Sequence, residues 1–361
     1  MNDVVALRHE LHRLAETSGN EAATSAHLQA WLSARGVDVV ETGIGGEGFL
    51  AKVGEPNRLF RADLDALPLA EATGVSYAAE NAHHACGHDG HMAMLAGALS
   101  KMAVDGGSAF GLFQPAEETG EGALACLADA SVANLPVKHC FAIHNLPGLP
   151  LGAVSVADGT AAVASEGLRL DFTGASSHAA EPFAGRSPVA AVASLALFAQ
   201  GLPNQVLPFD EGALATVVGM QSGGERYGTS PGEGQLFVTL RAGSDAAVQT
   251  LREGLVQHAK GLAEGCGLTL QWTQIEPFPA TRNDSTAVAL ARDAAKRAGC
   301  EVIAPQTAPW SEDFGHFTSK WPGALVLLGA GVSQPALHAP TYDFPDALLE
   351  RGVQFWWELA Q

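Results

Sequence analysis

One stretch of eight residues brings a cysteine, three histidines and an aspartate together, in the order His84-Ala85-Cys86-Gly87-His88-Asp89-Gly90-His91. In an extended loop the side chains alternate between two sides, so Cys86 and His88 are expected to point to the same side. A thiolate beside an imidazole is half of a binding site for zinc or another borderline-soft divalent metal. The other ligands must come from carboxylates and imidazoles elsewhere in the chain.

Two pairs of acidic residues follow predicted strands and could complete such a site. Asp63 and Asp65 follow a short apolar strand, where they are either ordinary turn residues or carboxylates that orient a metal-binding imidazole. Glu117 and Glu118 follow the next strand and are either a solvated acidic loop or a functional pair. If the backbone is extended there, the two carboxylates diverge. One can then bind a metal while the other takes a proton from the attacking water.

Two isolated histidines add further possible ligands. His144 ends a predicted strand, and His338 lies far along the chain. Each alone is more often a structural histidine than a ligand. Together with Cys86, His88 and Glu118 they provide enough ligands for two metal ions.

The length, charge and cysteine content of the chain limit the classes of protein to which it can belong. A chain of 361 residues with 47% hydrophobic residues predicts a folded protein of two domains. The net charge of -19, with no block of basic residues, argues against nucleic acid and anionic membranes as partners. With no long apolar run and no signal peptide at the N-terminus, we expect a soluble, cytoplasmic protein. The five scattered cysteines predict no disulfide framework.

The order of the predicted elements favours an α/β catalytic domain that is interrupted by a second domain. Strands and helices alternate in the first part of the chain, which predicts a mostly parallel sheet covered by helices. The acidic and imidazole residues follow the carboxyl ends of these strands, where such sheets bind ligands. Residues 165–276 show the ferredoxin-like order strand-helix-strand-strand-helix-strand. We therefore predict a discontinuous catalytic domain, residues 1–164 and 277–361, and an inserted α+β domain, residues 165–276.

Two motifs are expected to be misleading. Gly43 to Gly48 matches the dinucleotide pattern G-x-G-x-x-G, but a strand is predicted after it where a helix is required, so we interpret it as a turn. Gly228 to Gly232 matches the G-x-S-x-G pattern of serine hydrolases. Its serine is followed by Pro231, which has no N–H for an oxyanion hole.

Four motifs in a fixed order carry a resemblance to a known family, and they span nearly the whole chain. They are Arg61-Ala62-Asp63-Leu64-Asp65-Ala66-Leu67-Pro68, His84 to His91, Gln114-Pro115-Ala116-Glu117-Glu118 and Ser311-Glu312-Asp313-Phe314. The set resembles the amidohydrolase branch of the dinuclear-metal aminoacylase and carboxypeptidase G superfamily. This branch includes hippurate hydrolases, N-acyl-amino-acid hydrolases and the plant auxin-conjugate hydrolases.

The resemblance implies a role for each matching residue. The ligands of two divalent metal ions would be Cys86, His88, Glu118, His144 and His338. The thiolate and imidazoles favour zinc, and the carboxylate leaves manganese, cobalt or nickel open. Glu117 matches the general base, and Asp65 matches a carboxylate that orients a ligand. The remaining histidines of the cluster are then structural or supporting residues, namely His83, His84 and His91.

The resemblance also implies a role for the inserted domain. His178, within Gly174 to Ala180, matches a histidine that polarises the scissile carbonyl, often from the partner subunit. The inserted domain would be both a lid and the interface of a homodimer. One segment departs from the family, because Gly228 stands where an asparagine of an Asn-Val-Ile-Pro segment is usual. Arg226 and Tyr227 are possible substitutes, so the departure concerns the substrate more than the chemistry.

These observations lead to one hypothesis and two alternatives. The hypothesis is a metal-dependent amidohydrolase that cleaves a small N-acyl or N-aroyl amino acid. The first alternative is a dipeptidase, deacetylase or carbamoylase that uses the same metal site on a dipeptide-like or related substrate. The second is a non-catalytic protein that binds small molecules on the same fold, since fold alone does not establish function.

Overall fold

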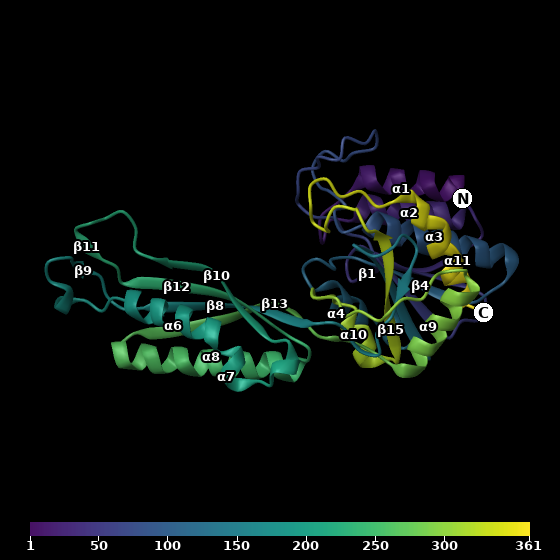
Figure 1. The fold of residues 1–361 in the computed structure, drawn as a ribbon. Coiled ribbons are helices and arrows are strands. Elements are labelled where there is room, and N and C mark those ends of the chain that lie inside the picture. Colours follow the sequence, from purple (N-terminus) through teal and green to yellow (C-terminus); the bar gives the residue numbers. More distant parts are fainter. The chain divides into compact units, whose positions relative to one another are not determined.

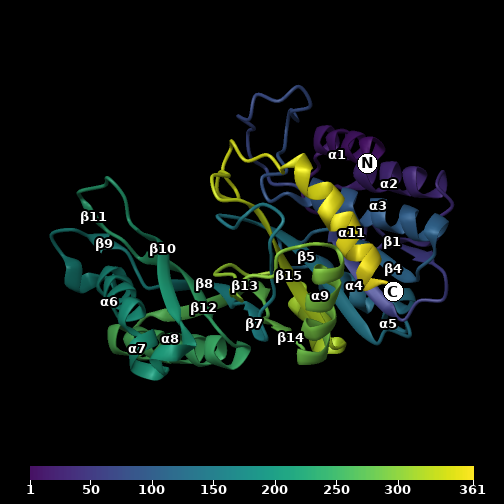
Figure 2. The same ribbon diagram turned by 45° about the vertical axis from the view of Figure 1, so that its right-hand side comes forward.

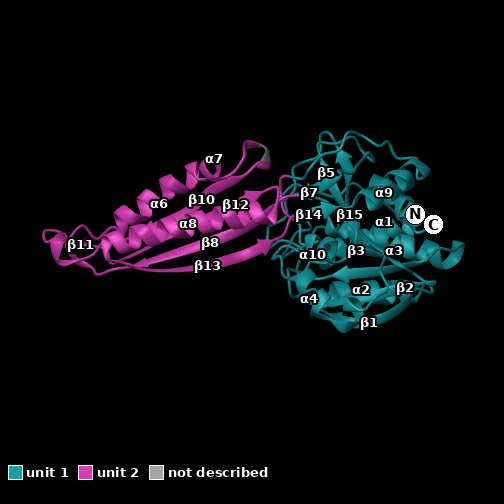
Figure 3. Cartoon of the chain, turned by 90° about the horizontal axis from the view of Figure 1, so that it is seen from below, with its two compact units in different colours: residues 1–161, 281–308, 312–361 teal, residues 162–280, 309–311 magenta. Residues whose placement is uncertain are grey.

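The computed structural model describes residues 1–361 apart from Asp210, and the chain divides into two compact units. Unit 1 consists of residues 1–161, 281–308 and 312–361, and unit 2 of residues 162–280 and 309–311 (Figure 3). Unit 2 is therefore formed almost entirely by one continuous stretch that interrupts unit 1.

A mixed sheet of seven strands forms the centre of unit 1 among the described residues, in the order β1-β2-β4-β3-β5-β15-β6 (Figure 1). Its strands are β1 (Asp38–Ile44), β2 (Gly48–Val53), β3 (Arg58–Asp63), β4 (Ala109–Gln114), β5 (His139–Pro147), β6 (Val154–Ser155) and β15 (Gly323–Gly331). The four neighbours β4, β3, β5 and β15 are parallel, whereas β1, β2 and β6 pair antiparallel. The predicted α/β class with a parallel core is confirmed, and the antiparallel outer strands make the sheet mixed.

Helices cover this sheet. They are α1 (Asn2–Leu14), α2 (Ala22–Ser33), α3 (His88–Asp105), α4 (Gly122–Ala128), α5 (Ala130–Ala133), α9 (Ser285–Arg297), α10 (Gly315–Lys320) and α11 (Leu349–Leu359). Two short strands, β7 (Gly159–Ala162) and β14 (Thr281–Asn283), complete the unit. Helix α3 packs against α1, α11 and β3, and α9 packs against β15 (Figure 2). The apolar residues Val4, Leu7 and Leu11 recur at helical spacing and bury one face of α1.

Unit 2 has the predicted ferredoxin-like order, β8, α6, β10, β12, α8 and β13. Its sheet runs β10-β12-β8-β13 with antiparallel neighbours. The elements are β8 (Ala164–Thr173), β9 (Ser177–His178), α6 (Val189–Gly201), α7 (Pro203–Val206), β10 (Leu214–Ser222), β11 (Thr229–Ser230), β12 (Glu233–Ala242), α8 (Asp245–Cys266) and β13 (Thr269–Phe278). Alternate residues of β8, namely Leu168, Leu170 and Phe172, are buried in the core of unit 2, where α8 packs against β8.

The longest helix of unit 2, α8, begins and ends at residues suited to those positions. The Ser244 hydroxyl accepts a hydrogen bond from the N–H of Ala247, and Gly267 ends the helix in the left-handed conformation. Leu251 and Leu255 lie on its buried face. The helix therefore follows from its own sequence as well as from its packing.

The fold also settles the two misleading motifs. Gly43 to Gly48 connects the antiparallel strands β1 and β2, so it is a turn and not the start of a helix. Gly228 to Gly232 contains the short strand β11 and leads into β12. In the part of the chain that the structure describes, all five cysteines are unpaired. Within the same residues, none of the helices is both long and apolar enough to cross a membrane.

Candidate metal centre

The carboxyl ends of three adjacent parallel strands place most of the candidate residues along one edge of the unit 1 sheet. Asp63 is the last residue of β3 and is paired in register with Gln114, the last residue of β4. His144 lies near the end of β5, on the other side of β3. Parallel neighbours end at the same edge of a sheet, so the segments that follow them converge there.

Cys86 and His88 approach each other through a turn, not through the extended loop that we predicted. Gly87 lies between them in the left-handed conformation, with φ +89°, and α3 begins directly at His88. A Cβ atom on Gly87 would lie 2.5 Å from Asn145 Oδ1, so only glycine fits at this position. One ligand atom each from Cys86, His88 and His144 lies within 4.8 Å of the other two.

Main-chain carbonyl groups fix the orientation of both buried imidazoles. His88 Nδ1 donates to the Asp65 carbonyl oxygen at 2.8 Å, and His144 Nδ1 donates to the Asn145 carbonyl oxygen at 2.8 Å. With the proton on Nδ1, the Nε2 atom of each ring is left to bind a metal. His144 Nε2 lies 3.5 Å from Cys86 Sγ. His88 Nε2 is buried and has no hydrogen-bond partner among the described residues.

Glu118 and His338 face the same place. Glu118 Oε1 lies 3.9 Å from His88 Nε2 and 3.7 Å from His338 Nε2. This oxygen is also buried without a hydrogen-bond partner in the described part of the chain. The main-chain N–H of His338 donates to the Ala85 carbonyl oxygen at 2.9 Å, which ties this distant segment to the loop of Cys86.

Two residues of the site have backbones that only glycine adopts easily. His338 has φ +65°, and Ala116, directly before Glu117, has φ +52°. Such conformations cost roughly 1–3 kcal/mol each and persist where the surrounding structure imposes them, commonly at functional sites. Glu117 and Glu118 then lie in a turn, not in the extended segment that we considered.

Asp65 connects the ligand segments. Its Oδ2 accepts hydrogen bonds from the Ser18 hydroxyl at 2.7 Å and from the Glu118 N–H at 3.0 Å. Burial alone would raise the pKa of Asp65, but the His88 ring and these hydrogen bonds hold the pKa below its usual range. Asp65 therefore orients His88 through its carbonyl group and fixes the main chain of Glu118 through its carboxylate.

Arg61 and Asp313 belong to the site, although the sequence analysis assigned them no role beyond their place in the motifs. The buried Arg61 guanidinium contacts Asp63 at 2.6 Å, Asp313 at 2.7 Å and Glu312 at 3.0 Å. The main-chain N–H of Asp313 donates to Glu117 Oε1 at 3.3 Å. The motif of Ser311 to Phe314 thus positions the predicted base, and its presence in the set of four motifs was the only signal for this.

His91 lies beside the rings of His88 and His144 and is tied to two strands by hydrogen bonds. Its Nδ1 lies 2.7 Å from Asp63 Oδ1, and its Nε2 lies 2.5 Å from Asn145 Oδ1. The Asn145 amide donates to the Tyr342 hydroxyl at 2.6 Å. His91 is thus held between β3 and β5, which agrees with a structural or supporting role.

The electrostatics of the carboxylates favour a cation. Burial, followed by the nearby Glu312 and Asp313 carboxylates, raises the pKa of Glu117 well above its usual value. Burial raises the pKa of Glu118 to about 7. A divalent cation beside these groups would favour their charged forms. The two unpartnered donors and the overlapping groups Cys86–His88–His144, Cys86–Glu118–His338 and His88–Glu117–Glu118 therefore fit a pair of divalent metal ions.

His178 belongs to unit 2, whereas the other seven candidate residues belong to unit 1. It is exposed, pairs with Thr229 of β11, and its Nδ1 accepts a hydrogen bond from the Ala180 N–H at 3.1 Å. The Ala179 N–H donates to the Gly228 carbonyl oxygen at 3.0 Å, so the segment that departs from the family pattern lies against the His178 motif.

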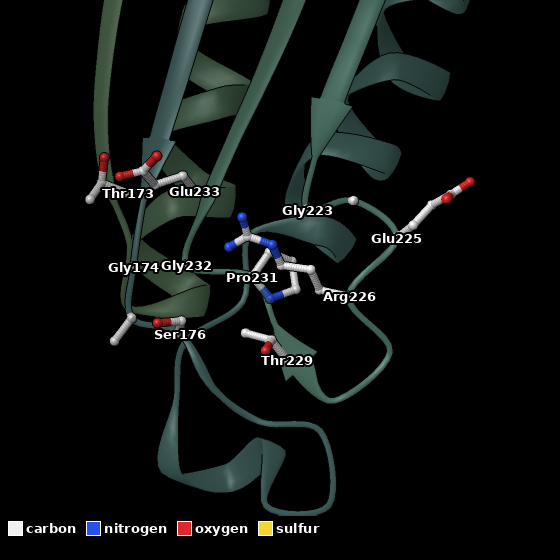
Figure 4. A pocket seen from close by; sticks show the side chains of 12 residues that line it. Thr173, Gly174, Ser176, Gly223, Glu225, Arg226, Thr229, Pro231, Gly232 and Glu233 are labelled. Atoms are coloured by element: carbon white, nitrogen blue, oxygen red, sulfur yellow. The ribbon is translucent and has the colours of Figure 1, made fainter.

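A cavity of about 920 Å³ lies beside these strands in unit 2. Its lining includes Ser176, Thr229 and Arg226, and the Arg226 side chain points into it (Figure 4). Tyr227 is 92% exposed and does not line the cavity. Of the two possible substitutes for the missing asparagine, only Arg226 therefore lines this cavity.

Residues 59–361 match the family described as "Peptidase family M20/M25/M40". The chain belongs to this peptidase family. It is 28% identical over 367 residues to the N-acetylcysteine deacetylase of Bacillus subtilis (strain 168), covering 99% of this chain and 96% of the relative. It is also 28% identical over 368 residues to the hippurate hydrolase of Campylobacter jejuni, and this match covers 98% of this chain and 94% of the relative.

Two solved structures have the same architecture. A dinuclear metal-binding M20 peptidase from Bacillus subtilis superimposes with a TM-score of 0.85 at 26% identity, covering 99% of this chain and 97% of that one. A putative aminohydrolase from methicillin-resistant Staphylococcus aureus, at 24% identity, shares the fold with a TM-score of 0.90 and covers 99% and 95%. The predicted family and fold class are confirmed. The chain is a metal-dependent hydrolase that acts on amide bonds, and its clustered donors support two divalent metal ions.

Proposed function

We propose that this M20 enzyme hydrolyses the amide bond of a small N-acyl or N-aroyl amino acid. The observation that carries the proposal is the pair of buried, unpartnered donors, His88 Nε2 and Glu118 Oε1, at the edge where Cys86 and His144 also converge. The similarity to a deacetylase of N-acetylcysteine and to a hippurate hydrolase supports a substrate of this size and kind.

The ligands of the two ions would be the five residues of the predicted set, Cys86, His88, Glu118, His144 and His338. A thiolate with three imidazoles favours zinc, and the carboxylate leaves manganese, cobalt or nickel open. When bound, the ions would supply Lewis acidity that lowers the pKa of a water molecule and polarises the substrate carbonyl.

Glu117 would act as the general base. The Asp313 N–H and the strained backbone at Ala116 fix the position of its carboxylate. It would take a proton from the attacking water and then return that proton to the leaving amine. Asp65 would keep His88 in the tautomer that presents Nε2.

The residues of unit 2 would recognise the substrate. His178 would donate a hydrogen bond to the oxygen that becomes negatively charged in the transition state. Arg226 would bind the free carboxylate of the amino-acid part, since its guanidinium points into a cavity that Ser176 and Thr229 also line (Figure 4). This would compensate for glycine at position 228.

We further propose a cytoplasmic homodimer. The apolar side chains of Leu214, Val218 and Met220 are exposed along β10, an edge strand of the unit 2 sheet, and could be covered by a second copy. The unpaired cysteines, and a proposed site that depends on one thiolate, suit a reducing compartment. The mass of the protein in solution, measured by light scattering, tests the dimer.

A substrate panel on zinc-reconstituted protein tests the activity. The panel contains N-acetyl and N-benzoyl amino acids, dipeptides and N-carbamoyl amino acids, with products identified by mass. We expect release of a free amino acid and a carboxylic acid from the N-acyl substrates. Preferential cleavage of dipeptides or N-carbamoyl compounds would favour the related activities. Full metal loading with no hydrolysis across the panel would favour a binding protein and contradict the proposal.

Oxidation tests the role of Cys86 separately. Peroxide converts an accessible thiolate to oxidised forms that bind metal poorly, so modification of Cys86 should release metal. Mass spectrometry locates the modified residue, and metal content is measured on the same sample. Modified Cys86 with unchanged metal content would show that Cys86 is not a ligand.

A further inference from the structure

We propose that unit 1 contains a separate, structural metal site formed by His12, Glu71 and His83. A ring nitrogen of each histidine and a carboxylate oxygen of Glu71 lie within 4.8 Å of one another. Both histidines are fully buried, and the Glu71 side chain is only 2% exposed. None of the three belongs to the set of ligands proposed for the catalytic ions.

His12 has the orientation of a metal-binding histidine. Its Nδ1 lies 2.8 Å from Asp89 Oδ2, and its Nε2 lies 3.2 Å from Glu71 Oε2. A carboxylate that accepts the proton of one ring nitrogen fixes the tautomer and directs the other nitrogen to a metal. Asp89 would have this role, and Glu71 would be a neighbouring ligand.

His83 offers a second nitrogen. Its Nε2 donates to the Tyr342 carbonyl oxygen at 2.8 Å, which leaves the lone pair on Nδ1. Nδ1 is buried and has no hydrogen-bond partner among the described residues. An acceptor that is buried without a partner costs free energy, and a bound cation would remove that cost.

The charge around His12 also favours a cation. The buried Arg8 guanidinium contacts Asp89 at 3.1 Å, Asp343 at 2.8 Å and Asp346 at 2.6 Å. Glu71 contacts His12, so the cluster contains four carboxylates and one guanidinium and stays negative even when His12 is protonated. The competing explanation is a protonated His12 that bridges Asp89 and Glu71 without metal, but it leaves Nδ1 of His83 unpartnered.

The proposed metal site would hold the long loop between β3 and α3 in place. In the described chain, residues 64–87 between β3 and α3 contain no helix or strand, and this segment includes both Glu71 and His83. Loops of this length are uncommon in compact domains and cost entropy to order. A metal would tie the loop to His12 of α1, and His83 in this loop is close in sequence to Cys86. Two imidazoles and a carboxylate favour zinc or a similar divalent metal.

Metal counting on the full chain tests this site without reference to turnover. The protein is loaded with zinc, freed of excess, and analysed for zinc per chain. The wild type should bind one equivalent more than the catalytic pair, and His83→Gln and Glu71→Gln should each lose that equivalent. His27→Gln is the matched control, because His27 makes a similar contact with Glu10 at 3.0 Å on the surface; it should bind as much zinc as the wild type.

Cobalt distinguishes the two kinds of site. The proposed catalytic site contains a thiolate and should give a sulfur-to-cobalt absorption band, whereas the site of His12 and His83 contains none. His83→Gln should therefore lose cobalt and visible absorption while the thiolate band stays. Circular dichroism checks folding, and Glu71→Gln, which keeps the shape of the side chain, repeats the test. A wild type that binds only the catalytic pair, or variants that bind as much metal as the wild type, would overturn the proposal.

Discussion

The two units bury very different side chains. In unit 1 the edge of the parallel strands contains a dense set of buried charged groups, including Arg61, Asp63 and Glu117. In unit 2 the core is apolar, and among the described residues Ser165 and Glu166 are its only fully buried polar side chains. The polar groups proposed to recognise substrate, His178 of the short strand β9 and Arg226, are exposed.

This difference shows how the fold divides the work. Parallel strands bring several loops to one edge, where charged groups can fix one another in a low-dielectric environment and shift their pKa values. An antiparallel sheet with one covered face provides a stable support, and its connecting loops remain free to contact ligands. We therefore expect chemistry and metal binding to depend on unit 1, and substrate recognition to depend on unit 2.

The largest effect should come from the predicted base. Glu117→Gln removes the group that accepts the proton, so kcat should fall by ~10²–10⁴ while metal content stays unchanged. Glu121→Gln is the control, because this nearby glutamate is exposed and should retain full activity. Near-normal turnover of metal-loaded Glu117→Gln would show that Glu117 is not the general base.

The next effect concerns polarisation of the carbonyl by unit 2. His178→Ala should lower kcat by ~10²–10³, the usual cost of losing one donor to the oxyanion. The metal content and the urea concentration at the midpoint of unfolding should not change. The His178 side chain is exposed, and we do not propose it as a metal ligand. A loss of metal in this variant would contradict the expectation that metal binding depends on unit 1 alone.

The third prediction concerns the close packing around Gly87, in the turn between Cys86 and His88. Gly87→Ala should destabilise the protein by more than the ~1–2 kcal/mol that a left-handed alanine costs, because the new methyl group meets Asn145. Gly212→Ala is a matched control, because Gly212 is also left-handed, with φ +59° and ψ +30°, and no atom lies within 4 Å of the added Cβ. Urea unfolding and zinc content measure the difference. Equal destabilisation of both variants, with metal retained, would mean that the close packing around Gly87 is not needed.

The smallest effect should be on substrate affinity. Arg226→Ala removes the proposed charged partner of the substrate carboxylate, so KM should rise by about tenfold to a hundredfold with little change in kcat. Arg169→Ala is the control, because Arg169 is an exposed arginine of unit 2 that pairs with Asp171. An amide substrate without the carboxylate should respond equally to both variants. If KM is unchanged for all substrates, Arg226 does not recognise the substrate.

Much of the fold followed from local patterns. The order strand-helix-strand-strand-helix-strand over residues 165–276 predicted the inserted α+β unit, because each element has a local pattern of its own, such as the alternate burial along β8. Boundaries near the site were predicted less well. Cys86 and His88 were expected in an extended loop, but left-handed Gly87 turns the chain directly into α3, which begins at His88.

The sequence by itself determined which residue types are available: a thiolate, several imidazoles and paired carboxylates, in motifs whose order indicated the family. Only the tertiary structure decided how they meet. The Asp313 N–H fixes Glu117 across a long stretch of chain, and His338 reaches the Cys86 loop through a bond to Ala85. The physical reason is that periodicity and turn preferences act between neighbours in sequence. The orientation of a buried donor depends instead on hydrogen bonds and packing between segments that meet only in the folded protein.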